Sequence, residues 1–253
     1  MKYAVLLFIG LFSVSSYALS YYSPEDQGEF ESGTLKDDDL ISRVRSAAGR
    51  NHKSLGYSKR AKKELYGFVE LERDNEGKFI YDVYCRRTVR DLGRNSLPKN
   101  SDVNTEHTWP QSLGAKSEPK RGDLHHLFPT DSKANSVRSS NPFGEVIGKD
   151  AHSNCSASQT GDIINPRTGK KGTRKGFQPP PEHRGNVARA MFYFASKYGY
   201  HLDSLQEHYL RKWHNDDPVD DREVERNNKI EQVQGNRNPY IDYPRLVDRI
   251  TDF

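Results

Sequence analysis

Cysteine, long apolar runs and metalloprotease motifs are scarce or missing in this chain of 253 residues. Its two cysteines, Cys85 and Cys155, form no C-x-x-C pair, which disfavours a zinc site built on thiolates. No H-E-x-x-H segment occurs, so a zinc protease of that type is disfavoured as well. Beyond the N-terminus no apolar run approaches the ~20 residues of a membrane-spanning helix. There is no internal repeat.

The first eighteen residues have the pattern of an export signal. Lys2 provides a positive start, residues 4–14 are apolar, and residues 16–18 supply small residues at cleavage-site spacing. A membrane anchor is the alternative, but the apolar run is too short to cross a bilayer. We therefore expect residues 1–18 to be removed and residues 19–253 to form one domain, periplasmic or secreted and without a membrane contact in its mature form.

Export to an oxidising compartment favours a disulfide between Cys85 and Cys155, with two buried free thiols as the alternative. The net charge of +4 is modest, but Lys and Arg are concentrated in residues 43–63, which contain no acid, and in residues 167–175. Such runs attract polyanions, although many are simply solvated surfaces. Polyanion binding therefore needs support from elsewhere in the chain.

Local patterns predict an α+β fold, a mostly helical single domain with a small antiparallel sheet. We expect a loosely held acidic arm over residues 21–39, short helices over 40–48 and 57–66, a hairpin over 68–85 and a loop over 91–104. The second half should contain helices near 187–198 and 202–213, a third that starts at Asp217-Pro218 and ends at Gly235, and a short one from Pro244. Residues 153–181, rich in Gly, Pro and Lys, are expected to be an irregular insert.

Residues 104–110, Asn-Thr-Glu-His-Thr-Trp-Pro, carry the most informative chemistry. They place Glu106 beside His107 in an extended segment, because Pro110 forbids a helix there. Adjacent side chains of a strand point to opposite faces, so His107 can face a reaction while Glu106 approaches a metal ion.

A second segment, residues 123–135, completes this arrangement. We expect a strand over 124–128 that Pro129 ends, then a helix capped by Thr130 or Asp131. Asn135 and Arg138 are three residues apart and so share one face of that helix. Oxygen ligands from Glu106 and Asn135 suit Mg²⁺ or Ca²⁺ better than zinc. His125 and His126 are expected to make structural hydrogen bonds.

The pattern Asn-x-Glu-His-x-Trp-Pro, then Asp-Leu-His-His-Leu-x-Pro-Thr-Asp-x-x-x-Asn and Asn-Pro-Phe-Gly, resembles the bacterial endonuclease I family. These are secreted, sequence-nonspecific nucleases with a ββα-metal (His-Me finger) site. The likeness covers most of residues 80–250 and is closest to a short-loop, cysteine-poor branch. Better-known periplasmic members have an acidic residue where this chain has Arg121.

The resemblance implies a role for each matched position. His107 would be the general base, Glu106 and Asn135 would bind one Mg²⁺, which Ca²⁺ or Mn²⁺ could replace, and Arg138 would lie near the scissile phosphate. Cleavage would leave a 5′-phosphate. The chemistry agrees, because a neutral imidazole can take a proton from attacking water while the ion stabilises charge on the departing oxygen.

We therefore predict an exported, metal-dependent endonuclease, a monomer that acts on DNA and RNA through phosphate contacts. Lys133, Arg174 and Lys175 are expected to assist Arg138 in those contacts. A histidine with an ordinary pKa would make activity rise between about pH 6 and 7. The alternative is a nucleic-acid-binding or cell-surface protein that keeps the fold without catalysis.

Overall fold

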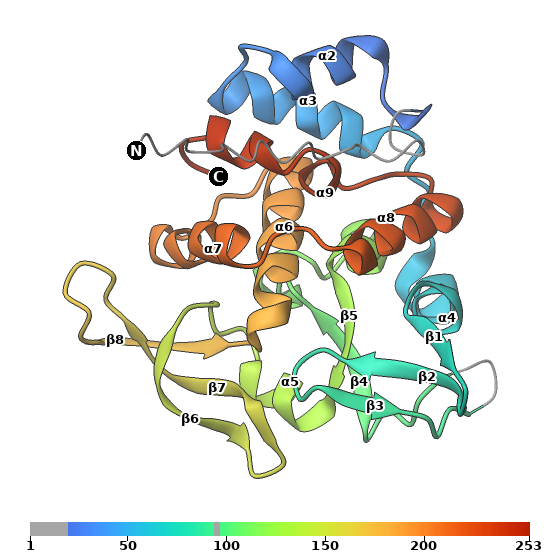
Figure 1. Ribbon diagram of the computed structural model, residues 1–253, viewed down its shortest axis with the longest axis vertical. Coiled ribbons are helices and arrows are strands. Elements are labelled where there is room, and N and C mark those ends of the chain that lie inside the picture. The colour runs from blue at the N-terminus through green and yellow to red at the C-terminus, as the bar shows by residue number, and fades with distance from the viewer. Residues whose placement is uncertain (1–19, 94–96) are drawn as a thin grey trace, which may run out of the picture.

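The computed structural model describes residues 20–93 and 97–253, so the expected export signal over residues 1–18 lies outside the described residues. Most of the helices lie in one half of the molecule and three small antiparallel sheets in the other, with α5 among the strands (Figure 1). This arrangement confirms the α+β expectation. None of the helices in the described part of the chain is long and apolar enough to span a membrane.

The elements follow one another along the chain with short connections. The helices are α2 (Pro24–Ser32), α3 (Asp37–Gly49), α4 (Lys62–Glu64), α5 (Ser132–Arg138), α6 (Pro181–Tyr198), α7 (Ser204–Asp216), α8 (Asp221–Gln234) and α9 (Pro239–Asp242), with π-helical turns Gly56–Ala61 and Leu65–Val69 on either side of α4 and a final 3₁₀ helix, Pro244–Arg249. The strands are β1 (Leu71–Asp74), β2 (Gly77–Asp82), β3 (Arg87–Val89), β4 (Val103–His107), β5 (Leu127–Asp131), β6 (Val146–His152), β7 (Cys155–Ile164) and β8 (Lys171–Gln178). They pair in the orders β1-β2-β3, β4-β5 and β6-β7-β8.

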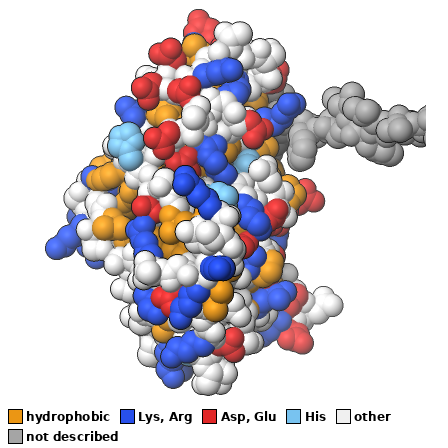
Figure 2. All heavy atoms as spheres, turned by 90° about the vertical axis from the view of Figure 1, so that its left-hand side faces the viewer, with side chains coloured by type: hydrophobic (Ala, Val, Ile, Leu, Met, Phe, Trp, Pro, Cys, Tyr) orange, Lys and Arg blue, Asp and Glu red, His pale blue; other side chains and the backbone are white. Residues whose placement is uncertain are grey.

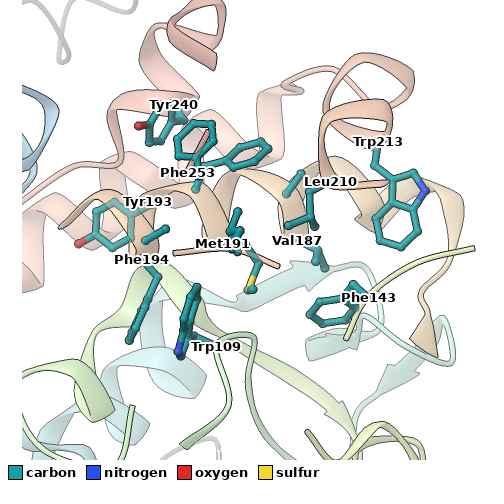
Figure 3. Packing of buried hydrophobic residues seen from close by; sticks show 14 of the residues in the cluster. Trp109, Phe143, Val187, Met191, Tyr193, Phe194, Leu210, Trp213, Tyr240 and Phe253 are labelled. Atoms are coloured by element: carbon teal, nitrogen blue, oxygen red, sulfur yellow. The ribbon is translucent and has the colours of Figure 1, made fainter. Parts of the chain in front are cut away.

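Helix α6 runs through the main hydrophobic core (Figure 3). Its residues are buried on nearly every side, as expected of a helix enclosed by other elements. Trp109, just after β4, stacks on Phe194 with ring centroids 5.0 Å apart. Phe253, the last residue of the chain, stacks on Phe192 with ring centroids 4.4 Å apart. The segment that follows β4 is thereby fixed against the centre of the molecule.

A second, smaller core joins the π-helical segment, β2, β4, β5 and α8. The predicted hairpin is present as β1 and β2, with Leu71 opposite Ile80 and a turn at Gly77. Gly77 has a φ of +117°, which a residue with a side chain rarely adopts. The alternating pattern therefore located this hairpin correctly.

Residues 21–39 were predicted to be a loose arm, and this was wrong, because they form α2 and the start of α3. Ser23 caps α2 by accepting from the amide of Asp26 at 3.1 Å, and Pro24 occupies the first turn. Arg249, near the other end of the chain, donates to the Glu29 carbonyl at 2.7 Å. Because this anchor comes from a distant segment, the local sequence does not indicate it.

Residues 153–181 were predicted to be irregular, and this too was wrong, because they contain β7 and β8. Gly148 lies opposite Gly161, which in turn lies opposite Gly176. A Cβ on Gly148 would collide with the Thr160 carbonyl, so the strands approach too closely there for a side chain. Glycine and lysine at such positions hide the apolar alternation by which strands are recognised.

The third helix of the second half begins later than predicted. Helix α8 starts at Asp221, and Asp220 caps it by accepting from the Glu223 amide at 2.8 Å. Asp217 instead ends α7 and accepts from the Gly185 amide at 2.8 Å. The end at Gly235 is as expected, since that residue has a φ of +85°.

Cys85 and Cys155 form a disulfide, which confirms that alternative over two free thiols. Cys85 follows β2 and Cys155 begins β7, so the bond joins the side of the molecule with the β1–β3 sheet to the side with the β6–β8 sheet. The two residues are separated by 70 positions in sequence.

Removing this crosslink is expected to destabilise the fold. A bond that spans 70 positions restricts the unfolded chain, so Cys85→Ala with Cys155→Ala should cost about 2–4 kcal/mol of unfolding free energy. Urea unfolding of the oxidised parent and the double variant measures the difference. Reductant should destabilise the parent and leave the variant unchanged. Equal unfolding midpoints for the two oxidised proteins would contradict the prediction.

Candidate functional site

Strands β4 and β5 and helix α5 form a strand–strand–helix unit that holds the predicted site residues. Glu106 and His107, at the end of β4, lie opposite Phe128 and Leu127 of β5. Helix α5 follows β5 directly, because the Asp131 side chain accepts from the first amides of the helix at 2.9 and 2.8 Å. The predicted ββα arrangement, with Asp131 as the cap, is therefore present.

The second strand lies later than the sequence predicts. Residues Leu124–His126 form a 3₁₀ turn, and β5 continues through Pro129 instead of ending before it. Proline fits there because its carbonyl still accepts from the Val83 amide at 3.0 Å. The Nε2 atoms of His125 and His126 lie 3.1 and 2.7 Å from backbone carbonyls, as expected of structural histidines.

Asn104 and Glu106 are two residues apart in β4 and so share one face of the strand. Helix α5 covers this face. Asn135 Nδ2 donates to Asn104 Oδ1 at 2.6 Å, and Arg138 Nη1 lies 2.9 Å from Glu106 Oε1. The structure thus places both predicted metal ligands between β4 and α5.

Glu106 is 2% exposed, and both of its polar contacts use Oε1. That oxygen accepts from the Tyr84 hydroxyl at 2.9 Å and pairs with Arg138. Among the residues that the structure describes, none donates a hydrogen bond to Glu106 Oε2 or Asn135 Oδ1. One carboxylate oxygen and one amide oxygen without partners fit a hard divalent cation. Burial raises the pKa of Glu106, whereas Arg138 and Tyr84 oppose that shift.

Arg138 does not face solvent. It is 1% exposed, and it donates to the carbonyls of His107 at 3.0 Å and Thr108 at 2.7 Å in addition to its pair with Glu106. The prediction that Arg138 contacts phosphate does not fit this geometry, because its guanidinium is already occupied inside the protein. Its position instead fixes the carboxylate of Glu106 and the backbone at the end of β4.

His107 has a separate set of neighbours from Glu106. Its Nε2 lies 3.1 Å from the Arg121 carbonyl, which can only accept, so Nε2 carries the hydrogen and Nδ1 keeps its lone pair. Gln111 Nε2 lies 3.4 Å from Nδ1. The imidazole ring packs 4.8 Å from the Tyr57 ring. The site therefore presents His107 in one tautomer, with Nδ1 as its basic nitrogen and the Gln111 amide as a donor to that nitrogen.

The pKa of His107 is lowered to about 3, first by burial and then by the neighbouring His126. This corrects the expectation of an ordinary pKa, because the imidazole is 6% exposed and its charged form is poorly solvated. His107 is consequently neutral throughout the neutral and mildly acidic range.

Tyr57, Tyr84 and Gln111 contact the site but were not predicted. Tyr84 and Tyr57 belong to segments that are far from residues 104–135 in sequence, so no local spacing connects them to the site. Gln111 lies four residues after His107 and could have been found only if the turn after Pro110 had been known.

The three basic residues predicted to assist nucleic-acid binding differ in their surroundings. Lys133 is exposed and forms no ion pair within the described residues, whereas Arg174 pairs with Asp203 at 2.6 Å and Lys175 with Asp162 at 2.8 Å. On the face that carries α7 and the β6–β8 sheet, Figure 2 shows Lys and Arg interspersed with Asp and Glu. Residues 167–175 are therefore less positive than their sequence suggests.

Comparison with known proteins adds an independent line of evidence. The family described as Endonuclease I matches residues 39–245. An extracellular ribonuclease of Bacillus subtilis (strain 168) is 29% identical over 261 residues, covering 95% of this chain and 83% of that protein. A periplasmic deoxyribonuclease of Aeromonas hydrophila is 32% identical over 130 residues, covering 51% of this chain and 50% of that protein. Endonuclease-1 of Buchnera aphidicola subsp. Acyrthosiphon pisum (strain APS) is 34% identical over 119 residues, 47% of this chain and 44% of that protein.

The chain spans about half the length of the last two relatives but most of the first. The family match includes all of β4, β5 and α5, and thus every residue of the ββα unit described above. The sequence pattern, the strand–strand–helix geometry and the extent of this match agree, and the chain belongs to the endonuclease I family.

Proposed function

We propose that this protein is an exported endonuclease that hydrolyses phosphodiester bonds of DNA and RNA with one divalent metal ion. The proposed ion is Mg²⁺, and Ca²⁺ or Mn²⁺ can occupy the same site. The proposal is carried by one oxygen on Glu106 and one on Asn135 that accept no hydrogen bond from the described residues, next to a neutral His107 of defined tautomer. The names of the relatives support both substrates and an extracellular or periplasmic location, since they include a ribonuclease and deoxyribonucleases.

Each side chain has a defined role in this proposal. Glu106 and Asn135 hold the ion, and Tyr84 and Arg138 keep the Glu106 carboxylate in place. When bound, the ion supplies positive charge to the scissile phosphate and the departing oxygen. His107 Nδ1 takes a proton from the attacking water, while the Arg121 carbonyl holds the opposite nitrogen and stabilises the imidazolium that forms.

The test of the proposed function is digestion of plasmid DNA and of RNA by the purified protein, with Mg²⁺ or with a chelator. We expect cleavage of both substrates only with the metal, and 5′-phosphate ends on the products. Intact nucleic acid under every condition would favour the alternative, a nucleic-acid-binding or cell-surface protein that has lost catalysis.

Glu106→Gln is expected to weaken metal binding by at least about tenfold, because it removes the only charge that the two proposed ligands offer the ion. Calorimetric titration with Mn²⁺ measures the dissociation constant without reference to cleavage. Glu225→Gln, at an exposed position of α8, is the matched control and should leave metal affinity unchanged. Equal affinities for the two variants would remove Glu106 from the site.

His107→Ala is expected to slow cleavage about 10²- to 10⁴-fold, the usual contribution of a general base. DNA should still shift on a gel, since the residue is 6% exposed and offers phosphate little surface. His201→Ala, at an exposed histidine, serves as the control. Cleavage by His107→Ala at the parent rate would show that another group activates the water.

Cleavage is expected to be independent of pH between about 5 and 8. Because burial lowers the pKa of His107 to about 3, the basic form predominates throughout this range and declines only as pH falls toward that value. Initial rates should be measured at saturating metal and constant ionic strength, with circular dichroism as the control for folding. A rate that rises tenfold per pH unit below 6.5 would indicate an imidazole of ordinary pKa.

A further inference from the structure

Two basic side chains converge on Tyr57, the ring that packs against His107. Lys62 Nζ lies 4.9 Å from the centroid of the Tyr57 ring, and the guanidinium carbon of Arg121 lies 4.7 Å from it. Tyr57 and Lys62 belong to the π-helical turn and to α4, whereas Arg121 lies in the 3₁₀ turn Lys120–Gly122. Two segments distant in sequence therefore bring positive charge to the same ring beside the proposed base.

Neither cation is neutralised. Across residues 20–93 and 97–253, Lys62 and Arg121 form no ion pair, and the buried Nε of Arg121 has no hydrogen-bond partner. Arg121 is half-buried, whereas two fully buried arginines are paired: Arg189 with Glu223 at 2.6 Å and Arg237 with Asp242 at 2.6 Å. The Arg121 guanidinium forms no ion pair with the described residues and is therefore open to an anionic partner.

Glu118, three residues before Arg121, does not supply that partner. Its two carboxylate oxygens accept from the backbone amides of Tyr57 at 2.7 Å and Gly122 at 3.1 Å. The carboxylate therefore ties the two segments together and leaves both basic side chains free. The positive charge also reaches the base, since Arg121 and Lys62 contribute to the lowered pKa of His107 after burial and His126.

We propose that Lys62 and Arg121, held on the Tyr57 ring, bind a backbone phosphate of the nucleic acid beside His107. An arginine fork can donate two hydrogen bonds to phosphate oxygens, and the lysine adds a point charge. Stacking on an aromatic ring holds both cations without neutralising them. This inference rests on the proposed function, and it assigns to Arg121 the phosphate contact that sequence reasoning gave to the buried Arg138.

Binding measured without cleavage tests the proposal. In a His107→Ala background without metal, fluorescence anisotropy of a labelled DNA duplex gives the affinity over a series of NaCl concentrations. Lys62→Ala and Arg121→Gln should each weaken binding and reduce the slope of log K against log salt by about 0.9, the value for one phosphate contact. Arg121→Lys should retain most of the slope because it keeps the charge.

Two matched controls distinguish a specific phosphate contact of Lys62 and Arg121 from nonspecific electrostatic attraction between the protein and DNA. Lys63→Ala, adjacent to Lys62, and Lys116→Ala, in the same loop as Arg121, remove exposed charges that do not contact Tyr57. The proposal requires smaller changes in slope for these controls than for Lys62→Ala and Arg121→Gln. Equal changes for all four variants, or unchanged slopes for the two site variants, would overturn it.

Thermal unfolding of each variant distinguishes loss of the phosphate contact from loss of structure. A stacking role alone would lower the unfolding temperature and leave the salt slope of the folded protein at the parent value, which would also overturn the proposal. Failure of the parent protein to cut nucleic acid would refute the proposed function, whereas the slopes here are obtained without cleavage.

Discussion

The buried ion pair between Glu106 and Arg138 is the contact on which the site depends. Both side chains are 2% exposed, so removal of either partner would leave an uncompensated charge in the interior, at a cost of about 3–5 kcal/mol. The same guanidinium binds the carbonyls of His107 and Thr108. One arginine therefore fixes both the carboxylate and the backbone that carries the imidazole, and β4 and α5 are held as one unit.

This pair also keeps the carboxylate of Glu106, the proposed metal ligand, in a fixed orientation inside the protein. Arg138 and Tyr84 occupy only Oε1 of Glu106, so the carboxylate is oriented while Oε2 accepts no hydrogen bond from the described part of the chain. Asn135 is oriented in the same way by Asn104, through its amide nitrogen. The side chains of the proposed ligands are thus already oriented in the folded protein, and binding of an ion would require little rearrangement of them.

Local sequence patterns were sufficient to predict those features of the site that depend only on neighbouring residues, such as helix spacing and capping. The shared helix face of Asn135 and Arg138 follows from helix geometry and was predicted correctly, and Asp131 was one of the two caps predicted. The same spacing could not show that this helix face meets β4, where the Arg138 guanidinium is occupied by Glu106 and not by the phosphate that was predicted. Helix α2 was missed for a similar reason, because its anchor, Arg249, comes from the opposite end of the chain.

Arg121 shows how far a single position can alter the balance of charge in the site. Where the resemblance leads us to expect an acid, this chain has a base whose carbonyl orients His107. Its side chain stacks on Tyr57 and forms no ion pair with the residues that the structure describes. An acid there would raise the pKa of His107 and repel phosphate, whereas the guanidinium does the opposite on both counts. Part of the positive charge that a nuclease needs near phosphate would then come from Arg121 and from Lys62, one residue of the basic run over 43–63.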